Sequence, residues 1–369
     1  MFEHVFHRMQ EDIQDVIRPY QKKCDERLNL LFQDDSLLDR VAGYSLKAPG
    51  KRLRAILHLL VVEALGGDPG KALPGSLAYE MAHTASLVHD DIMDNAGLRR
   101  GREPAFRRFG LDAAIVSGDA LLIRAFQMIE EYRETDLSRE DLMALISCTA
   151  RMGLKACRGQ LMDGVMGLAP ETFTIRDYLQ MVAGKTASLI EGPCEGGAIV
   201  AGKKKFRRQA ALFGRSLGIA FQILDDSKDI FSCESSSLKG RFTDLINNKP
   251  NIYLIWSLKK ADPVSREKLL KIMNGHKPTA QEEHFLYDLL LGTGVLKNVS
   301  LLYRSYLVRS LKMLACLPET AGREKLGRII QVMSAWPDPE TARKMGIRPV
   351  RPLDRIQNNL PGQSAPDNP

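Results

Sequence analysis

The sequence contains few cysteines, and none of them is spaced for a zinc site or a redox motif. All six lack a Cys-x-x-Cys or Cys/His pairing, which is typical of reduced thiols in a cytoplasmic protein. The first residues carry a charge every few positions, so they do not resemble a signal peptide, and no apolar run is long enough to span a membrane. We therefore expect a cytoplasmic protein with at most peripheral membrane contact.

Other patterns missing from the sequence exclude several classes of fold. There is no alternation typical of strands, no internal repeat, and neither a GxGxxG motif nor a P-loop. Apolar residues recur instead at spacings of three and four, which predicts helices. The expected helical segments include 2–32, 113–132, 139–154, 175–194, 252–260, 264–273, 282–291, 299–317 and 324–333. We expect an all-α protein.

Composition and charge leave several partners open. The 369 residues are 44% hydrophobic and 26% charged, which is enough to bury a core. The net charge of +7 admits nucleic acid, lipid headgroups or phosphorylated metabolites. We interpret the basic run at 203–208 as a solvated helix face, with membrane attachment as the alternative. We expect no nucleic-acid partner, because the basic residues interleave with carboxylates that a phosphate backbone would repel.

An acidic cluster followed at once by arginines is the strongest local signal. Asp90, Asp91 and Asp94 lie at i, i+1 and i+4 at the end of a predicted helix, so Asp90 and Asp94 should share one face. Three arginines follow within residues 99–102. Carboxylates suit Mg²⁺, which fills its other positions with water and substrate phosphates, and arginines suit the same phosphates. The stretch predicts a diphosphate site, with a solvated helix terminus as the alternative.

A second acidic cluster repeats this spacing later in the chain. Asp225, Asp226 and Asp229 again lie at i, i+1 and i+4 after an apolar helical run. Two copies in one chain favour a metal and diphosphate site over a solvated terminus. A basic patch at residues 51–54 opens another predicted helix, where positive charge opposes the helix dipole. A bound anion would remove that conflict.

Together these motifs resemble the trans-isoprenyl diphosphate synthases, the polyprenyl synthetase family, over roughly residues 5–335. The resemblance rests on the order and spacing of GKRLR at 50–54, HDDIMD and LRRG within 89–101, GQLMD at 159–163, KTA at 185–187 and GIAFQILDDSKD at 218–229. It implies an isoprenoid-synthase-type helical bundle around a central apolar cavity over residues 1–335. It also implies a homodimer. The Pro-rich composition of 336–369 predicts a disordered tail.

The resemblance implies a prenyltransferase that condenses isopentenyl diphosphate head-to-tail with an allylic diphosphate. The implied Mg²⁺ ligands are Asp90, Asp94, Asp225 and Asp229. Asp91 and Asp226 would complete the catalytic clusters in a supporting role. The implied ligands of the allylic diphosphate are Arg99, Lys185, Thr186, Gln222, Lys239 and Lys249. The implied ligands of isopentenyl diphosphate are Lys51, Arg54, His83 and Arg100, with a buried core histidine as the alternative interpretation of His83.

The implied chemistry fits these residue types. Ionisation of the allylic C–O bond places negative charge on the departing diphosphate, which Mg²⁺, lysine and arginine stabilise. The isopentenyl double bond then attacks the allylic cation, and a proton leaves to the released diphosphate. Because no side chain need form a covalent bond, the lack of a Ser/His/Asp or Cys/His pair is expected.

Product length in the family is set just before the first acidic cluster. Here Ala85 and Ser86 are small, which favours a product of C20 or longer. Tyr79 falls on the same helix face about 16 Å below Asp90 and is a candidate for a deeper stop.

Three segments depart from the family pattern. Ala55 replaces the usual proline after GKRLR. The segment after LRRG reads PAFR at 104–107, where the family has a proline-threonine pair and then a histidine. The late lysine lies in NKPN at 248–251 rather than in Gly-Lys-x-Thr. The metal-ligand positions are unaffected. The departures bear instead on Lys249 and on the polar loop at 232–251, which is a candidate lid over the site.

Three alternative functions stay open. A geranylgeranyl diphosphate synthase would stop at C20. A class I terpene cyclase would share the metal ligands but would not need the basic residues 51, 54 and 100. A non-catalytic partner subunit would be expected to have lost one acidic cluster, whereas this chain keeps both.

Overall fold

The computed structural model describes residues 13–32, 36–231, 242–273, 277–337 and 342–343. Within these ranges the regular elements are helices, and the one β-bridge joins Arg99 to Arg102. The helices are α2 (Gln14–Asn29), α3 (Leu37–Leu46), α4 (Leu53–Ala64), α5 (Leu73–Met93), α6 (Ala105–Phe109), α7 (Leu111–Glu130), α8 (Arg139–Leu168), α9 (Ile175–Val182), α10 (Ser188–Val200), α11 (Arg207–Phe231), α12 (Thr243–Ile246), α13 (Ile252–Lys260), α14 (Pro263–Ile272), α15 (Ala280–Gly292), α16 (Val295–Ala315) and α17 (Ala321–Ser334). Short 3₁₀ turns cover Glu131–Glu134, Pro170–Thr172 and Lys204–Phe206. The predicted all-α class is confirmed.

Four of the predicted helices after residue 250, namely α13, α14, α15 and α17, begin within three residues of their predicted starts, and a polar side chain caps each of them. The segment expected at 252–260 is α13, whose N-cap Asn251 accepts a hydrogen bond from the backbone of Tyr253. Helix α15 begins at a capping box between Thr279 and Glu282. The N-terminal helix expected over 2–32 is observed as α2, and residues 1–12 lie outside the described ranges.

The prediction of one continuous helix over 175–194 was wrong in one respect. The structure divides it into α9 and α10, separated by a π-helical turn at Ala183–Ala187, and α10 continues to Val200. Periodicity could not reveal this turn, because it widens the helix by one residue without a proline at the break. Such π-turns are frequent at functional sites. This one contains Lys185 and Thr186.

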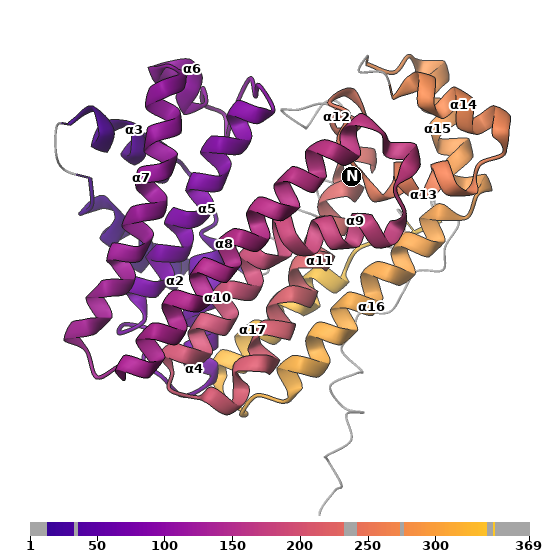
Figure 1. The fold of residues 1–369 in the computed structure, drawn as a ribbon. Coiled ribbons are helices and arrows are strands. Elements are labelled where there is room, and N and C mark those ends of the chain that lie inside the picture. Colours follow the sequence, from indigo (N-terminus) through magenta and orange to yellow (C-terminus); the bar gives the residue numbers. More distant parts are fainter. Residues whose placement is uncertain (1–12, 33–35, 232–241, 274–276, 338–341, 344–369) are drawn as a thin grey trace, which may run out of the picture.

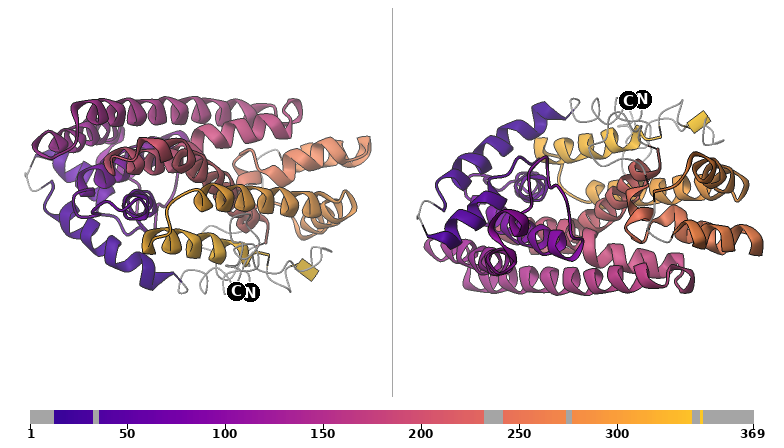
Figure 2. Two further views of the ribbon diagram at one scale, coloured as in Figure 1. Left: turned by 90° about the horizontal axis from the view of Figure 1, so that it is seen from below. Right: turned by 90° about the horizontal axis from the view of Figure 1, so that it is seen from above.

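Helix α10 is the central element of the bundle. It packs against α4, α5, α8 and α11. Close approach depends on small residues: a Cβ at Gly196 would lie 2.1 Å from the Tyr79 hydroxyl oxygen, which comes from α5. Figure 1 shows α3, α6 and α7 at one side of the molecule and α13 to α15 at the other. Figure 2 shows the long helix α8 along one edge.

The packed domain extends past the end of α17. Trp336 is fully buried, with its ring centroid 5.1 Å from that of Tyr303, so the packed domain includes this residue. Most of the predicted tail at 336–369 lies outside the described residues. In the described part, no single helix has the length and apolarity to cross a bilayer; α15 and α16 meet that test only as a pair bent by 65°.

Candidate active site

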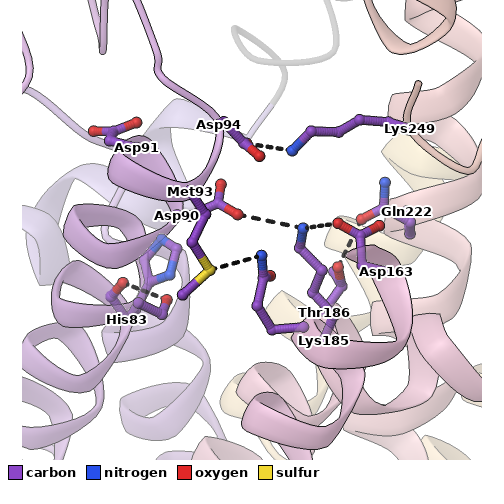
Figure 3. Close-up of polar contacts among 12 residues, drawn as sticks. His83, Asp90, Asp91, Met93, Asp94, Asp163, Lys185, Thr186, Gln222 and Lys249 are labelled. Carbon is purple, nitrogen blue, oxygen red and sulfur yellow. Dashed lines mark hydrogen bonds and ion pairs between the residues drawn. The ribbon is translucent and has the colours of Figure 1, made fainter. Parts of the chain in front are cut away.

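The first acidic cluster lies at the C-terminal end of α5. Asp90 and Asp91 belong to its last turn, and Asp94 is the C-cap. Figure 3 shows Asp90 and Asp94 directed toward one wall of side chains and Asp91 directed away from it. Asp94 is hydrogen-bonded to Lys249, which comes from the connection between α12 and α13. The shared face predicted for Asp90 and Asp94 is therefore observed.

The arginine loop after α5 holds this cluster from one side. Arg99 donates from Nε to Asp91 Oδ1 at 2.6 Å, and its Nη2 lies 3.5 Å from Asp90 Oδ2. A residue that the sequence analysis did not select, Arg107, donates from Nε to the carbonyl of Ala96 at 2.8 Å and from Nη2 to Asn95 Oδ1 at 3.0 Å. Arg107 thus fixes the segment just after the first acidic cluster.

The facing wall is built from α8, the π-turn and α11. Lys185 Nζ lies 2.6 Å from Asp163 Oδ2 and 3.3 Å from Asp90 Oδ1. Burial alone would raise the pKa of Asp90, but the positive charges of Lys185, Lys249 and Arg99 outweigh burial and lower it. The π-turn packs closely against α8 at Gly159, where a Cβ would lie 2.0 Å from the Lys185 backbone nitrogen.

The second acidic cluster lies near the end of α11, in different surroundings. Asp226 is buried and accepts hydrogen bonds from the Tyr178 hydroxyl at 2.7 Å and from Gln222 Nε2 at 2.9 Å. Burial raises the pKa of Asp226 to about 7. Asp229 accepts from the backbone of Thr243 at 2.7 Å, whereas the side chain of Asp225 is 57% exposed and lies 3.2 Å from Lys228.

The two clusters are connected through hydrogen bonds on the facing wall. Thr186 donates to Gln222 Oε1 at 2.7 Å, and Gln222 donates onward to Asp226. The π-turn therefore presents Lys185 to the first cluster and Thr186 toward the second. These predicted allylic-diphosphate residues are brought together in one site.

The basic residues at 51–54, at the start of α4, have different roles. Arg52 is buried in ion pairs with Asp25 at 2.9 Å and with Glu80 at 3.3 Å, so it stabilises the fold and is not available to a ligand. Burial lowers the pKa of Arg54 to about 10. Lys51 is at the surface, and partial burial together with the charge of Lys228 lowers its pKa.

Arg54, His83 and Arg100 form a group of nearby basic side chains. Arg100 lies against Gly50, where a Cβ would be 2.5 Å from its Nη1. Burial, followed by the charges of Arg54 and Arg100, lowers the pKa of His83 well below its usual value. Arg54 Nε and His83 Nδ1 are buried and have no hydrogen-bond partner within the described structure. An orphaned Arg54 N–H among further basic side chains is what an anion would satisfy.

Several residues of the site were missed, and one selected residue cannot be placed. Asp163 stands in the sequence motifs only as the last residue of GQLMD, and Asp244 belongs to no motif. Asp244 is half-buried, and its desolvation with the charges of Asp229 and Asp226 raises its pKa well above its usual value. A carboxylate between two lysines in a polar loop gave no signal of such burial. Lys239 lies outside the described residues.

The carboxylates of the two clusters are suitable oxygen ligands for a divalent metal, although they are not arranged as a preformed metal site. The donors are all carboxylates, as Mg²⁺ prefers, and the buried Asp90 Oδ1 already faces a positive charge, the Lys185 ammonium at 3.3 Å. Across the described ranges, no three His, Cys, Asp or Glu side chains are grouped closely enough to hold one ion. Lysines lie against Asp90 and Asp94 instead. Such a site suits a metal that enters with a substrate phosphate.

Comparisons with known proteins identify the family of this chain. Residues 35–290 match the family described as polyprenyl synthetase. A short chain isoprenyl diphosphate synthase of Methanothermobacter thermautotrophicus is 33% identical over 86% of this chain and 97% of its own length. A geranylfarnesyl diphosphate synthase of Aeropyrum pernix is 33% identical over 78% of this chain and 91% of its own length. Among solved structures, geranylgeranyl pyrophosphate synthetase from Pyrococcus horikoshii superimposes with a TM-score of 0.79 at 29% identity, covering 90% of this chain and 98% of its own.

Proposed function

The chain belongs to the polyprenyl synthetase family, whose members are trans-prenyltransferases acting on isopentenyl and allylic diphosphates, and from this premise we propose an all-trans polyprenyl diphosphate synthase with a product of C20 or longer. The observation that supports it best is the arrangement of charge. Carboxylates at the ends of α5 and α11, lysine and threonine from the π-turn, and a separate basic group beside α4 all belong to one site.

Two clusters of carboxylates would hold the metal. Asp90 and Asp94 from α5, with Asp225 and Asp229 from α11, would bind Mg²⁺, which supplies positive charge for the departing diphosphate. Family members bind divalent metal, and the oxygen-only donor set favours Mg²⁺ among the choices. Asp91 and Asp226 would orient Arg99 and Gln222, to which they are hydrogen-bonded or ion-paired.

The two diphosphates would bind on different sides of the first cluster. Arg99, Lys185, Thr186 and Gln222 would hold the allylic diphosphate, because Lys185 and Arg99 already lie beside Asp90. As the C–O bond breaks, charge grows on the bridging oxygen, and these fixed donors stabilise it. Lys249, from the facing side of the site, would close over the same group.

Isopentenyl diphosphate would bind at the basic group beside α4. Lys51, Arg54, His83 and Arg100 would hold its diphosphate, and the orphaned Arg54 Nε would gain an acceptor. This places the second double bond beside the allylic carbon. The new C–C bond then forms at that carbon, and the released diphosphate accepts the proton that leaves. A class I cyclase would have no use for this second basic group.

Product length would be limited by Tyr79 rather than by the residues near the first cluster. Ala85 and Ser86 have small side chains, and Ser86 donates to the carbonyl of His83, so neither is bulky enough to stop a growing chain. Tyr79 is fully buried, with its ring centroid 5.3 Å from that of His58 on α4 and its hydroxyl against Gly196 on α10. Three helices therefore fix this ring about 16 Å below Asp90.

Substitution of Tyr79 tests this limit. Tyr79→Ala is expected to shift the main product to greater length, whereas Tyr79→Phe, which keeps the ring, should leave it unchanged. Chromatography of the dephosphorylated products measures both, and thermal melting shows that each variant is folded. An identical product distribution for Tyr79→Ala would discard the limit and favour a synthase that stops at C20 for another reason.

We also propose a homodimer formed through α7 and α8. Both helices expose apolar residues: Leu111, Ile115, Val116, Leu122, Ile123 and Phe126 on α7, and Leu154, Leu161, Val165 and Leu168 on α8. Monomeric proteins rarely expose so much apolar surface. Light scattering should give twice the chain mass of 41.2 kDa, and Ile123→Glu should reduce it to one chain. A monomer at all concentrations would contradict this proposal.

The function itself is tested by incubating the purified protein with Mg²⁺, labelled isopentenyl diphosphate and each C5, C10, C15 or C20 allylic diphosphate. The proposal predicts a ladder of products ending at one length of C20 or more. A cyclic hydrocarbon formed from the allylic substrate alone would identify a cyclase. No incorporation with any primer would identify a subunit that needs a partner.

A further inference from the structure

A second basic hollow lies outside the site described above, between α3 and α6. Its volume is about 370 Å³, and four basic residues line it: Arg40, Lys47, Arg102 and Arg108. All four side chains are exposed. We propose that this hollow is a further phosphate-binding site, separate from those of the two substrates, which takes the phosphate or diphosphate group of a small anion. None of its lining residues is a proposed ligand of either substrate.

The charge in this hollow is not compensated by the protein. Within the described ranges, none of its four cations has a carboxylate within 4.0 Å of a charged nitrogen. The one acid in its wall, Asp39, is buried and lies 2.5 Å from Arg124 Nη2, so its charge is already paired. The acidic residues Asp34 and Asp35 lie outside the described ranges. Like charges held close together without counter-ions favour a multiply charged anion.

Aromatic rings orient one of these cations. The Arg108 guanidinium carbon lies 4.9 Å from the Tyr44 ring centroid and 5.5 Å from that of Phe109. Tyr44 is itself fixed, because its hydroxyl donates to the carbonyl of Glu103 at 2.8 Å. A guanidinium held on two rings keeps its N–H donors free and loses less entropy on binding. Such a donor set matches phosphate geometry better than lysine alone.

The hollow adjoins the proposed isopentenyl diphosphate side of the site. Tyr44 and Arg102 line both this hollow and a small inner pocket of about 30 Å³, whose wall includes Arg99 and Arg100. Because Arg102 belongs to the same arginine loop as Arg99 and Arg100, an anion in the outer hollow would contact that loop. A role in collecting isopentenyl diphosphate from solution follows, and that role rests on the proposed function, whereas phosphate binding does not.

Equilibrium dialysis of the full-length protein against labelled inorganic diphosphate in EDTA tests the site without turnover. Without a divalent metal, the proposal predicts two sites per chain: the hollow and the proposed isopentenyl diphosphate site. The variant Arg40→Gln/Lys47→Gln/Arg108→Gln should weaken one of them about tenfold or more. Lys51→Gln/Arg100→Gln should weaken the other. The matched control Lys203→Gln/Lys205→Gln/Arg208→Gln removes equal charge from another basic run and should leave both sites intact.

A lipid phosphate is the second source of the same chemistry, and vesicle sedimentation separates it from free diphosphate. If the hollow takes a lipid headgroup, the Arg40/Lys47/Arg108 triple variant (the hollow variant) should lose binding to phosphatidylglycerol vesicles. The control variant should keep that binding, and the hollow substitutions should not change binding to phosphatidylcholine vesicles. Either loss supports a phosphate site in the hollow. Unchanged binding of both diphosphate and vesicles by the hollow variant would overturn the proposal. Failure of the proposed function would appear separately, as a wild-type protein that makes no product.

Discussion

The first acidic cluster faces cations from other segments, whereas the second lies among further carboxylates. Asp90 and Asp94 are paired with Lys185 and Lys249, and the side chain of Asp90 is 19% exposed. In the second cluster, burial raises the pKa of Asp226 and Asp229. The same i, i+1, i+4 pattern therefore gives two electrostatic environments. The first cluster is paired with lysines from distant segments, whereas in the second Asp225 pairs with Lys228 of its own helix, and Asp226 and Asp229 accept hydrogen bonds from neutral donors.

If both clusters act on one diphosphate, loss of either should be severe. Asp90→Ala and Asp225→Ala are each expected to reduce kcat by about 10²- to 10³-fold, the scale of removing one electrostatic stabiliser. Initial rates with saturating Mg²⁺ and both substrates measure this. Asp288→Ala on α15, whose side chain is 63% exposed, is the control and should be close to wild type. Near-normal rates for both cluster variants would refute the two-cluster account.

The lysines beside the clusters sharpen the contrast. Lys249 spans the site to reach Asp94, whereas Lys228 reaches Asp225 from within the same helix at i, i+3. Lys249→Ala should lower kcat/KM about tenfold, the scale of one hydrogen bond to a charged group. Lys228→Ala removes a largely local surface pair and should change kcat/KM less than about threefold. Equal effects of the two substitutions would show that the contrast has no consequence for catalysis.

Arg107 should matter for the first cluster alone. Arg107→Ala releases the Asn95–Ala96 segment next to Asp94, so the Mg²⁺ concentration for half-maximal activity should rise about fivefold through loss of positioning. Arg107→Lys should restore part of this. Arg108→Gln, the neighbouring residue, makes no bond to that segment and should leave the Mg²⁺ requirement unchanged. An unaltered requirement in Arg107→Ala would remove this residue from the account.

The smallest expected effect concerns stability near the second cluster. Asp244→Asn removes a half-buried negative charge beside Asp229 while keeping a group that can accept from Asn251, at 2.9 Å in the wild type. Without divalent metal at pH 8, the melting temperature should rise by about 2 °C. Asp288→Asn, at an exposed position, should not change it. A lower melting temperature for Asp244→Asn would show that the extra carboxylate is stabilising.

The helices and the two acidic clusters were predictable because they depend on local spacing. Periodicity predicts α13 to within a residue, and the i, i+4 rule places Asp90 and Asp94 on one face. Arg52 was not distinguishable from its basic neighbours, because its partners Asp25 and Glu80 are distant in sequence.

Other features of the site depend on tertiary contacts that spacing does not encode. The π-turn at 183–187 forms where α8 passes close by at Gly159, and no residue within the turn signals it. Asp244 becomes half-buried only when its loop packs beside α11. The roles assigned to the substrate-binding residues stay predictions, which the variants above are designed to test.

The measurement that tests the central claim most directly is calorimetric binding of a non-reactive thiolo analogue of an allylic diphosphate, with and without Mg²⁺. The account predicts tight binding by the wild type only when Mg²⁺ is present, and its loss in both Asp90→Asn and Asp225→Asn, since one diphosphate must engage both clusters. Binding that is equally tight without Mg²⁺, or that survives in either variant, would contradict a shared diphosphate site.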